Sequence, residues 1–432
     1  MGNLTASKPG MRTLFRAMHP TIRLLLVLGF LESTAVIFYT SVLIPYYRSL
    51  GYGPETAGIL NSVLQIASAV TFTVSGFAAD RLGRKKLFTA GQLMRCVVAG
   101  SLLFTKSYLG FVLIHVFRGL STMQSPAQDA IVAECTESST RATSFAFVDT
   151  LHQLAGFSAP ILAGTIADRY GVRVPFSIGL AVACVTVIMG LGVKEAKNKL
   201  VFENPRERSP GGATEGHPSS GGSRSLLSQI RDMFTNNRAD VLYTLLAANV
   251  ISGIGNGTVN ILLPFTIMDR FSDTYTAVSG IQAAASLGTM LVLLVGGRLA
   301  DLHGRRRVIL ANLILPIAIL SVFAVTSLWQ MYAVILVATL VGNLSSPAIR
   351  ALHLEVVSQG DRASFSGLTS GLSAVGVALG SAMAGFCYKW TPNGAWILDI
   401  LMFALSGILF VLAASRHEQR VSDRQQETRP AP

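Results

Sequence analysis

Three apolar runs of this sequence hold ionisable side chains. Glu32 and Arg118 each lie well inside such a run, and a third run holds Asp149 and His152. A charge at the centre of a bilayer costs about 2.5–3.5 kcal/mol on insertion scales, so these groups should face water or the protein interior. Asp149 and His152, spaced i, i+3, share a helix face. We interpret Glu32, Asp149 and His152 as proton-binding groups; the alternatives are a static ion pair and a packing histidine.

A second group of polar side chains could bind a solute through hydrogen bonds. The apolar run near 239–267 contains three glycines and Pro264, which loosen a helix and leave backbone groups available beside a cavity. Asn256 and Asn260 share one face of that helix. Amides can instead join neighbouring helices, and this alternative stays open for each Asn. The candidate substrate-binding residues are Arg118, Tyr39, Gln153, Asn256 and Asn260.

Motifs for catalysis are absent from the sequence. It contains no H-x-x-x-H pair, no nucleophile elbow and no phosphate-binding loop. Its four cysteines follow no metal-ligand or disulfide spacing. We therefore expect neither an enzyme nor a bound metal or cofactor, and no direct use of ATP.

The elements that position these residues are membrane-spanning helices. Of 432 residues, 50% are hydrophobic and 13% are charged, whereas soluble domains carry about 25% charged residues. A span needs about 20 apolar residues, so a chain of this length can hold about a dozen. The predicted helices lie near 22–46, 55–79, 87–105, 108–131, 141–166, 173–193, 239–267, 275–299, 308–326, 328–354, 363–386 and 395–414.

The polar segments divide the chain into two halves. A Gly-, Ser- and Pro-rich stretch is typical of a flexible linker, and the amphipathic residues after it indicate an interfacial helix. Most basic residues fall in segments on one side, which predicts that both termini are cytoplasmic and accounts for the net charge of +12 without nucleic acid. The predicted parts are an N-terminal segment 1–21, a six-helix half 22–193, a linker 194–238, a second six-helix half 239–414 and a tail 415–432.

An internal repeat relates the two halves. The segment 76–86 (GFAADRLGRKK) recurs as 297–307 (GRLADLHGRRR), 221 residues later. The same offset carries residues 125–127 (SPA) onto 346–348 and needs no gap. A weaker copy at 164–171 follows the first by 88 residues. Three-helix units therefore repeat within each six-helix half, as in transporters built from nested repeats related by a pseudo-two-fold axis.

These features together resemble the major facilitator superfamily. The loop between helices two and three, its C-half copy and two six-helix halves around a polar linker carry the resemblance. It implies an all-α integral membrane protein of twelve helices, whose halves rock about a central site. Arg118-Gly119 resembles the superfamily's helix-four arginine motif, but Ser121, Thr122 and Met123 replace the downstream glycines.

The resemblance also implies a cytoplasmic gate of charged residues in two symmetric clusters. The Glu-x6-Arg spacing in both halves is similar to that of sugar porters, where such pairs lock the gate. The alternative role for these charges is control of topology. The gate residues are Asp80, Arg84, Glu134, Arg141, Asp301, Arg305, Glu355 and Arg362.

The residues and the resemblance together predict a secondary transporter in the cell membrane that is powered by a proton gradient. The small residues at 155–164 are similar to a motif of drug:proton antiporters, which favours efflux of an apolar or cationic compound. A proton-linked symporter or facilitator of a sugar-like or anionic metabolite is the alternative, with Arg118 binding the anion. A receptor would need a long folded soluble region, which the sequence lacks. The expected partners are a small-molecule substrate and the lipid bilayer, and the protein is expected to be a monomer.

Overall fold

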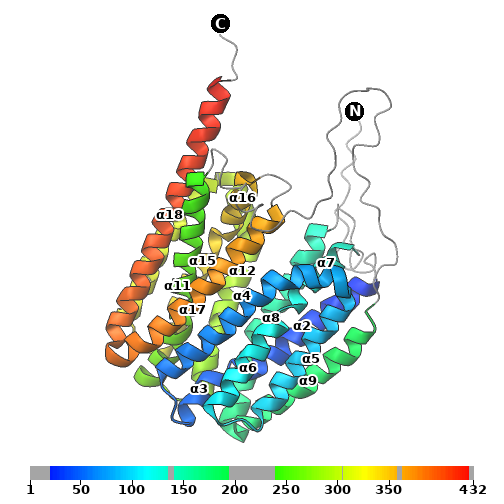
Figure 1. Ribbon diagram of the computed structural model, residues 1–432. Coiled ribbons are helices and arrows are strands. Elements are labelled where there is room, and N and C mark those ends of the chain that lie inside the picture. Colours follow the sequence, from blue (N-terminus) through cyan, green and yellow to red (C-terminus); the bar gives the residue numbers. More distant parts are fainter. Residues whose placement is uncertain (1–19, 135–140, 194–238, 304, 358–361, 428–432) are drawn as a thin grey trace, which may run out of the picture.

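The computed structural model describes residues 20–134, 141–193, 239–303, 305–357 and 362–427. Every regular element in these ranges is an α-helix or a short 3-10 helix. The helices run side by side, so that α2 begins and α18 ends at one end of the bundle, which we call the terminal end (Figure 1). We call the opposite end, which carries α3, the α3 end.

In the described residues, the N-terminal half contains six helical rods, each made of one helix or of two successive helices. The first is α2 (Pro20–Thr40) continued by α3 (Leu43–Ser49), and the fourth is α6 (Tyr108–Ser121) continued by α7 (Gln124–Glu134). The others are α4 (Pro54–Leu82), α5 (Arg84–Leu102), α8 (Arg141–Tyr170) and α9 (Arg173–Leu191).

The C-terminal half repeats this arrangement. Its third rod is broken into α13 (Arg305–Leu310), η2 (Ala311–Ile314), α14 (Leu315–Leu320) and η3 (Ser321–Ala324), and its fourth into α15 (Leu328–Leu344) and α16 (Ser346–Val356). The others are α11 (Ala239–Arg270), α12 (Tyr275–His303), α17 (Arg362–Trp390) and α18 (Pro392–Glu427). The prediction of twelve helices in two six-helix halves is confirmed.

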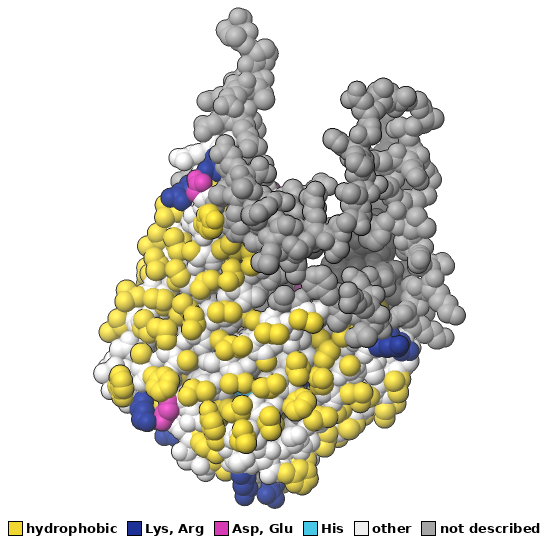
Figure 2. Space-filling model, viewed as in Figure 1, with side chains coloured by type: hydrophobic (Ala, Val, Ile, Leu, Met, Phe, Trp, Pro, Cys, Tyr) yellow, Lys and Arg dark blue, Asp and Glu magenta, His cyan; other side chains and the backbone are white. Residues whose placement is uncertain are grey.

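The outer surface of the bundle suits a bilayer. On the face that Figure 2 shows, hydrophobic side chains cover the middle of the described part, and charged ones lie near its ends. Exposed apolar side chains include those of Val70, Leu109, Ile188, Ile317 and Ile397. In the described part, seven helical stretches are long and apolar enough to cross a membrane: Ile22–Ser49, Arg173–Leu191, Asp240–Arg270, Arg307–Ala324, Leu328–Arg350, Gly367–Trp390 and Pro392–Arg420.

Local sequence signals explain several helix boundaries. Gly83 is the single residue between α4 and α5, and its φ of 89° is one that other residues rarely adopt. Ser107 caps α6 by accepting a hydrogen bond from the backbone N–H of Gly110. Ser327 and Gln330 form a capping box at the start of α15.

The two halves meet along two pairs of helices. α4 packs against α17, and α8 packs against α12. At the first seam, a Cβ on Gly58 would overlap the backbone oxygen of Ser381, and at the second a Cβ on Gly164 would overlap the Ser279 hydroxyl. Backbones therefore approach closely at both seams.

The glycines of α17 divide between two contacts. Gly385 faces the backbone of Pro54 across the seam, which agrees with the expected role of small residues between the halves. Gly376 and Gly380 instead pack against the backbone of α11, in their own half. Helix α17 therefore presents one face to α4 and another to α11.

Candidate functional site

Glu32 lies in a buried polar cluster of the N-terminal half. Its side chain is only 4% exposed, and Oε2 lies 3.5 Å from Nη1 of Arg95 on α5. The amide of Gln92, one turn earlier on α5, donates a hydrogen bond to Oε1 at 2.5 Å. Sequence reasoning considered Arg118 as the partner of Glu32, but among the described side chains that ion pair is made by Arg95. Because both oxygens have cationic or N–H partners, Glu32 is accommodated here as a carboxylate.

His152 lies beside this cluster. Its Nε2 is buried and has no hydrogen-bond partner among the described residues. Gly29 of α2 gives the ring room, since a Cβ there would come within 2.9 Å of Nε2. Both Glu32 and Asp149 are near enough to act electrostatically on His152. Asp149 is exposed, whereas Glu32 is buried, so the two candidate carboxyl groups near this imidazole sit in different surroundings.

Arg118 belongs to a separate cluster with aromatic side chains. Its guanidinium lies over the ring of Tyr39, 5.8 Å from the centroid, and Nη1 is 3.3 Å from Nε2 of His115. The Tyr47 hydroxyl is 3.4 Å from the same nitrogen. Nδ1 of His115 donates to the carbonyl of Phe111 at 2.8 Å, so a neutral ring presents Nε2 as the acceptor. The cluster holds Arg118 by a cation–π contact and a neutral histidine.

A cavity of about 980 Å³ lies mainly in the C-terminal half. Its walls come from α11, the segment 312–322, α15, α16, α17 and α18, and Gln65 and Phe72 of α4 close one side. Asn256 and Asn260 both line it, as expected of substrate-binding residues. Arg118, Tyr39 and Gln153 are not among its described lining residues.

The cavity also holds polar groups that are not among the candidate substrate-binding residues. Arg350 and His353 of α16 line it, and Nε2 of His353 is 3.1 Å from the amide nitrogen of Asn249. Asn312 lines it as well and accepts a hydrogen bond from the Ser345 hydroxyl at 2.8 Å. A basic residue and a histidine close together at the end of the span 328–354 were the available signal.

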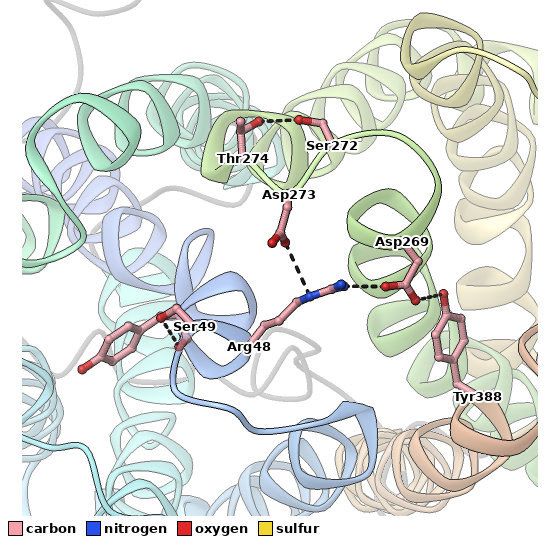
Figure 3. A network of polar contacts seen from close by, with 8 residues as sticks. Arg48, Ser49, Asp269, Ser272, Asp273, Thr274 and Tyr388 are labelled. Atoms are coloured by element: carbon pink, nitrogen blue, oxygen red, sulfur yellow. Dashed lines mark hydrogen bonds and ion pairs between the residues drawn. The ribbon is translucent and has the colours of Figure 1, made fainter.

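At the α3 end, an arginine of the N-terminal half reaches across to the C-terminal half. Nη1 of Arg48 lies 2.6 Å from Oδ1 of Asp269, and its Nε lies 3.6 Å from Oδ1 of Asp273. The Tyr388 hydroxyl donates to Oδ2 of Asp269 at 2.9 Å. Figure 3 shows Arg48 extending between the two aspartates. We call this group of four the Arg48 lock.

Two further contacts join the halves at the same end. Lys389 of α17 pairs with Glu55 of α4 at 2.8 Å. Asp168 of α8 accepts the backbone N–H groups of Tyr275 and Thr276 at 2.8 and 2.9 Å, and so caps α12. The repeat offset of 221 carries position 48 onto 269, 55 onto 276 and 168 onto 389. Symmetry-related positions therefore close this end in the conformation seen.

The predicted gate at the terminal end falls largely outside the described residues. Of its eight side chains, only Glu355 is described, and its Oε2 lies 3.8 Å from Nε2 of His417. The side chains of Asp80, Arg84, Glu134, Arg141, Asp301, Arg305 and Arg362 lie outside the described residues. Within the described part, no group of His, Cys, Asp or Glu side chains is arranged to hold a metal ion.

Two six-helix halves around a polar cavity, with apolar surfaces that suit a bilayer, define a membrane transport protein. The family model of the Major Facilitator Superfamily matches residues 25–250 and 245–432. The chain belongs to this superfamily, which confirms the resemblance seen in its motifs.

Similar proteins include pumps and exchangers. The chain is 19% identical over 387 residues to the quinolone resistance protein NorA of Staphylococcus aureus, covering 88% of this chain and 93% of NorA. It is 26% identical over 196 residues to a Na(+), Li(+), K(+)/H(+) antiporter of Planococcus maritimus, 43% of each chain. Among solved structures, the nucleoside transporter NupG shares the fold, with a TM-score of 0.67, 15% identity and coverage of 92% of this chain and 99% of NupG. Several other relatives are matched over less than half of their length.

Proposed function

We propose that this protein is a proton-coupled efflux transporter, which exchanges protons for a small apolar or cationic compound. The observation that carries the proposal is the buried pair of Glu32 and Arg95. A carboxylate inside a membrane protein is stable only while paired, so separating the pair favours uptake of a proton. The likeness to an efflux pump and to a cation/proton antiporter supports the same function.

The coupling works through alternation between two states of the N-terminal half. With Glu32 on α2 and Arg95 on α5, any relative movement of these helices changes whether the carboxylate has its cationic partner. Asp149 is the rival proton carrier, because it is exposed and lies close to His152. In this proposal Arg118 and Tyr39 bind the substrate from the same half, and Gln153 contributes a hydrogen bond to it.

The rocking of the halves is gated at both ends. The Arg48 lock and the pairs beside it close the α3 end, which we assign to the outer side of the cell membrane because basic residues favour the other side. The protein therefore stands in its outward-closed state. The charged clusters around Asp80 and Asp301 serve as the opposite gate, with both termini cytoplasmic and a single chain as the working unit.

A second candidate function follows from the chemistry of the cavity. Its described lining is rich in amides and hydroxyls, and Arg350 is the one Lys or Arg among those residues, with no Asp or Glu. Such a surface suits a neutral polar or anionic solute better than a cation. The alternative function is thus symport or facilitated transport of a sugar-like or anionic metabolite, and the fold shared with a nucleoside transporter is compatible with it.

One experiment in proteoliposomes distinguishes the two functions. A panel of cationic, apolar, sugar-like and anionic compounds is tested for movement under an imposed pH gradient. Proton-coupled efflux predicts that a cationic or apolar compound moves in the direction opposite to the protons. It also predicts that Glu32→Gln abolishes this coupling but keeps exchange of substrate down its own gradient. Asp240→Asn is the matched control, since this exposed carboxylate of α11 pairs with Arg420.

Two possible outcomes of this experiment would contradict the proposed efflux function or its proton carriers. Loss of transport in Arg350→Ala, with normal proton-coupled activity in Glu32→Gln, would support an anionic or sugar-like substrate instead. Substrate-induced proton release that persists unchanged in both Glu32→Gln and Asp149→Asn rules out both carboxyl groups as carriers.

A further inference from the structure

A third carboxyl group inside the membrane region has no role in the sites described above. Asp399 of α18 is 0% exposed. Neither of its side-chain oxygens has a hydrogen-bond partner among the described residues. An isolated buried charge is far less stable than a buried neutral acid, so a carboxyl group in this position is accommodated with a proton bound.

No described side chain near Asp399 supplies a positive charge that would stabilise its carboxylate form. Helix α18 packs against α11, α16, α17 and the broken rod of α13 and α14. The described titratable groups of these helices are, on α11, Asp240, Tyr243, Asp269 and Arg270; on α13, Arg307; on α16, Arg350, His353 and Glu355; and on α17, Cys387, Tyr388 and Lys389. None of them acts electrostatically on Asp399. Asp399 is therefore unlike Glu32, which keeps its charge through Arg95.

The position of Asp399 on α18 connects it to the cavity. Trp396 and Phe403 both line the cavity, and Asp399 is three residues after one and four before the other. Residues at these spacings share a helix face. Asp399 thus lies on the cavity side of α18, in sequence between two aromatic residues that line the cavity. The Trp396 indole N–H donates a hydrogen bond to the Thr266 hydroxyl at 3.0 Å. A turn of α18 exposes the acid to the cavity.

We propose that Asp399 is a second proton-binding site of the transport cycle, which holds a proton in the outward-closed conformation and releases it when the C-terminal half moves. This inference rests on the proposed proton coupling. A metal cation needs several oxygen ligands, and no other polar atom lies within hydrogen-bond distance of this carboxyl group in the described part. A proton needs one ligand only.

The first test uses the unmodified protein in membranes. Dicyclohexylcarbodiimide is an apolar reagent that adds the O–H of a neutral carboxylic acid across its C=N bond, and the resulting O-acylisourea rearranges to a stable N-acylurea. Peptide mass spectrometry should find the adduct on Asp399 and not on Asp269, whose carboxylate is paired with Arg48. An unlabelled Asp399 would overturn the inference, whatever the substrate of the transporter.

The second test measures coupling. In proteoliposomes, Asp399→Asn should lower the number of protons released per substrate and remove one step from the pH profile of transport, whereas Asp240→Asn should change neither. An unchanged proton count and pH profile in Asp399→Asn, alongside proton-coupled transport by the wild-type protein, would refute the role of Asp399. Absence of proton movement in the wild-type protein would refute the proposed function instead, and with it this inference, while the labelling result would still report the protonation of Asp399.

Discussion

The Arg48 lock makes the conformational equilibrium sensitive to one side chain. Arg48 and Asp269 are 35% and 41% exposed, and exposed ion pairs contribute about 0–1 kcal/mol. The second carboxylate of Asp273 and the hydrogen bond from Tyr388 place this pair near the upper limit. We expect Arg48→Ala to weaken the closed α3 end by about 1 kcal/mol, which changes the ratio of closed to open molecules about fivefold.

Accessibility of a cavity residue measures this ratio. In a background without the native cysteines, a cysteine at Leu263, which is buried and lines the cavity, is modified by an impermeant thiol reagent applied from the α3 side. The rate should rise about fivefold in Arg48→Ala. It should also rise with salt in the parent protein, because salt screens exposed charges. Arg173→Ala, which removes an exposed arginine at the start of α9, is the control.

A double variant that exchanges the charges of Arg48 and Asp269 is the decisive test of the lock. Positions 48 and 269 are copies of one another in the repeat, so Arg48→Asp combined with Asp269→Arg rebuilds the pair in the opposite direction. The double variant should restore slow modification, while each single change accelerates it. If the double variant behaves as the sum of its single changes, or if Arg173→Ala accelerates modification equally, then the lock does not hold the end closed.

Three further outcomes test the remaining contacts. If the gate proposed at the terminal end operates, Asp80→Asn and Asp301→Asn should slow transport at normal expression, because each change weakens charge contacts that only one gate state makes. Normal turnover in both variants would remove these residues from the gate. Gly58→Ala should reduce both transport and thermal stability, since the new methyl group meets the backbone oxygen of Ser381. Wild-type values for both would show that the contact between α4 and α17 accommodates the methyl group. Asp168→Ala should destabilise the start of α12 by about 1 kcal/mol through loss of its cap, which hydrogen exchange at Thr276 would detect as faster exchange.

The helices of this protein were predictable from its sequence because their signals are local. Apolar runs of sufficient length and the charged loop at Gly83 mark where each helix begins and ends. The repeat offset likewise showed that two halves share one architecture. Asn256 and Asn260 could be placed on one face of a helix with no knowledge of its neighbours, and that face lines the cavity.

Contacts between helices were much harder to predict. The partner of Glu32 is Arg95 on α5, and a single sequence does not reveal which face of α5 meets α2. The sequence did not single out Asp399, because one acidic residue near the start of an apolar run is typical of the membrane–water interface. The Arg48 lock was hidden for a different reason: two of its four residues, Arg48 and Asp269, occupy equivalent positions in the repeat but carry opposite charges.

That opposition of charge has a consequence for how two halves of this kind can assemble. In a dimer of identical units, a residue on the two-fold axis meets its own copy, so two N-terminal halves would bring Arg48 against Arg48 and two C-terminal halves would bring Asp269 against Asp269. Like charges in contact disfavour both pairings. A contact between Arg48 and Asp269 therefore selects the mixed assembly, and separately produced halves of this protein should pair with each other rather than with themselves.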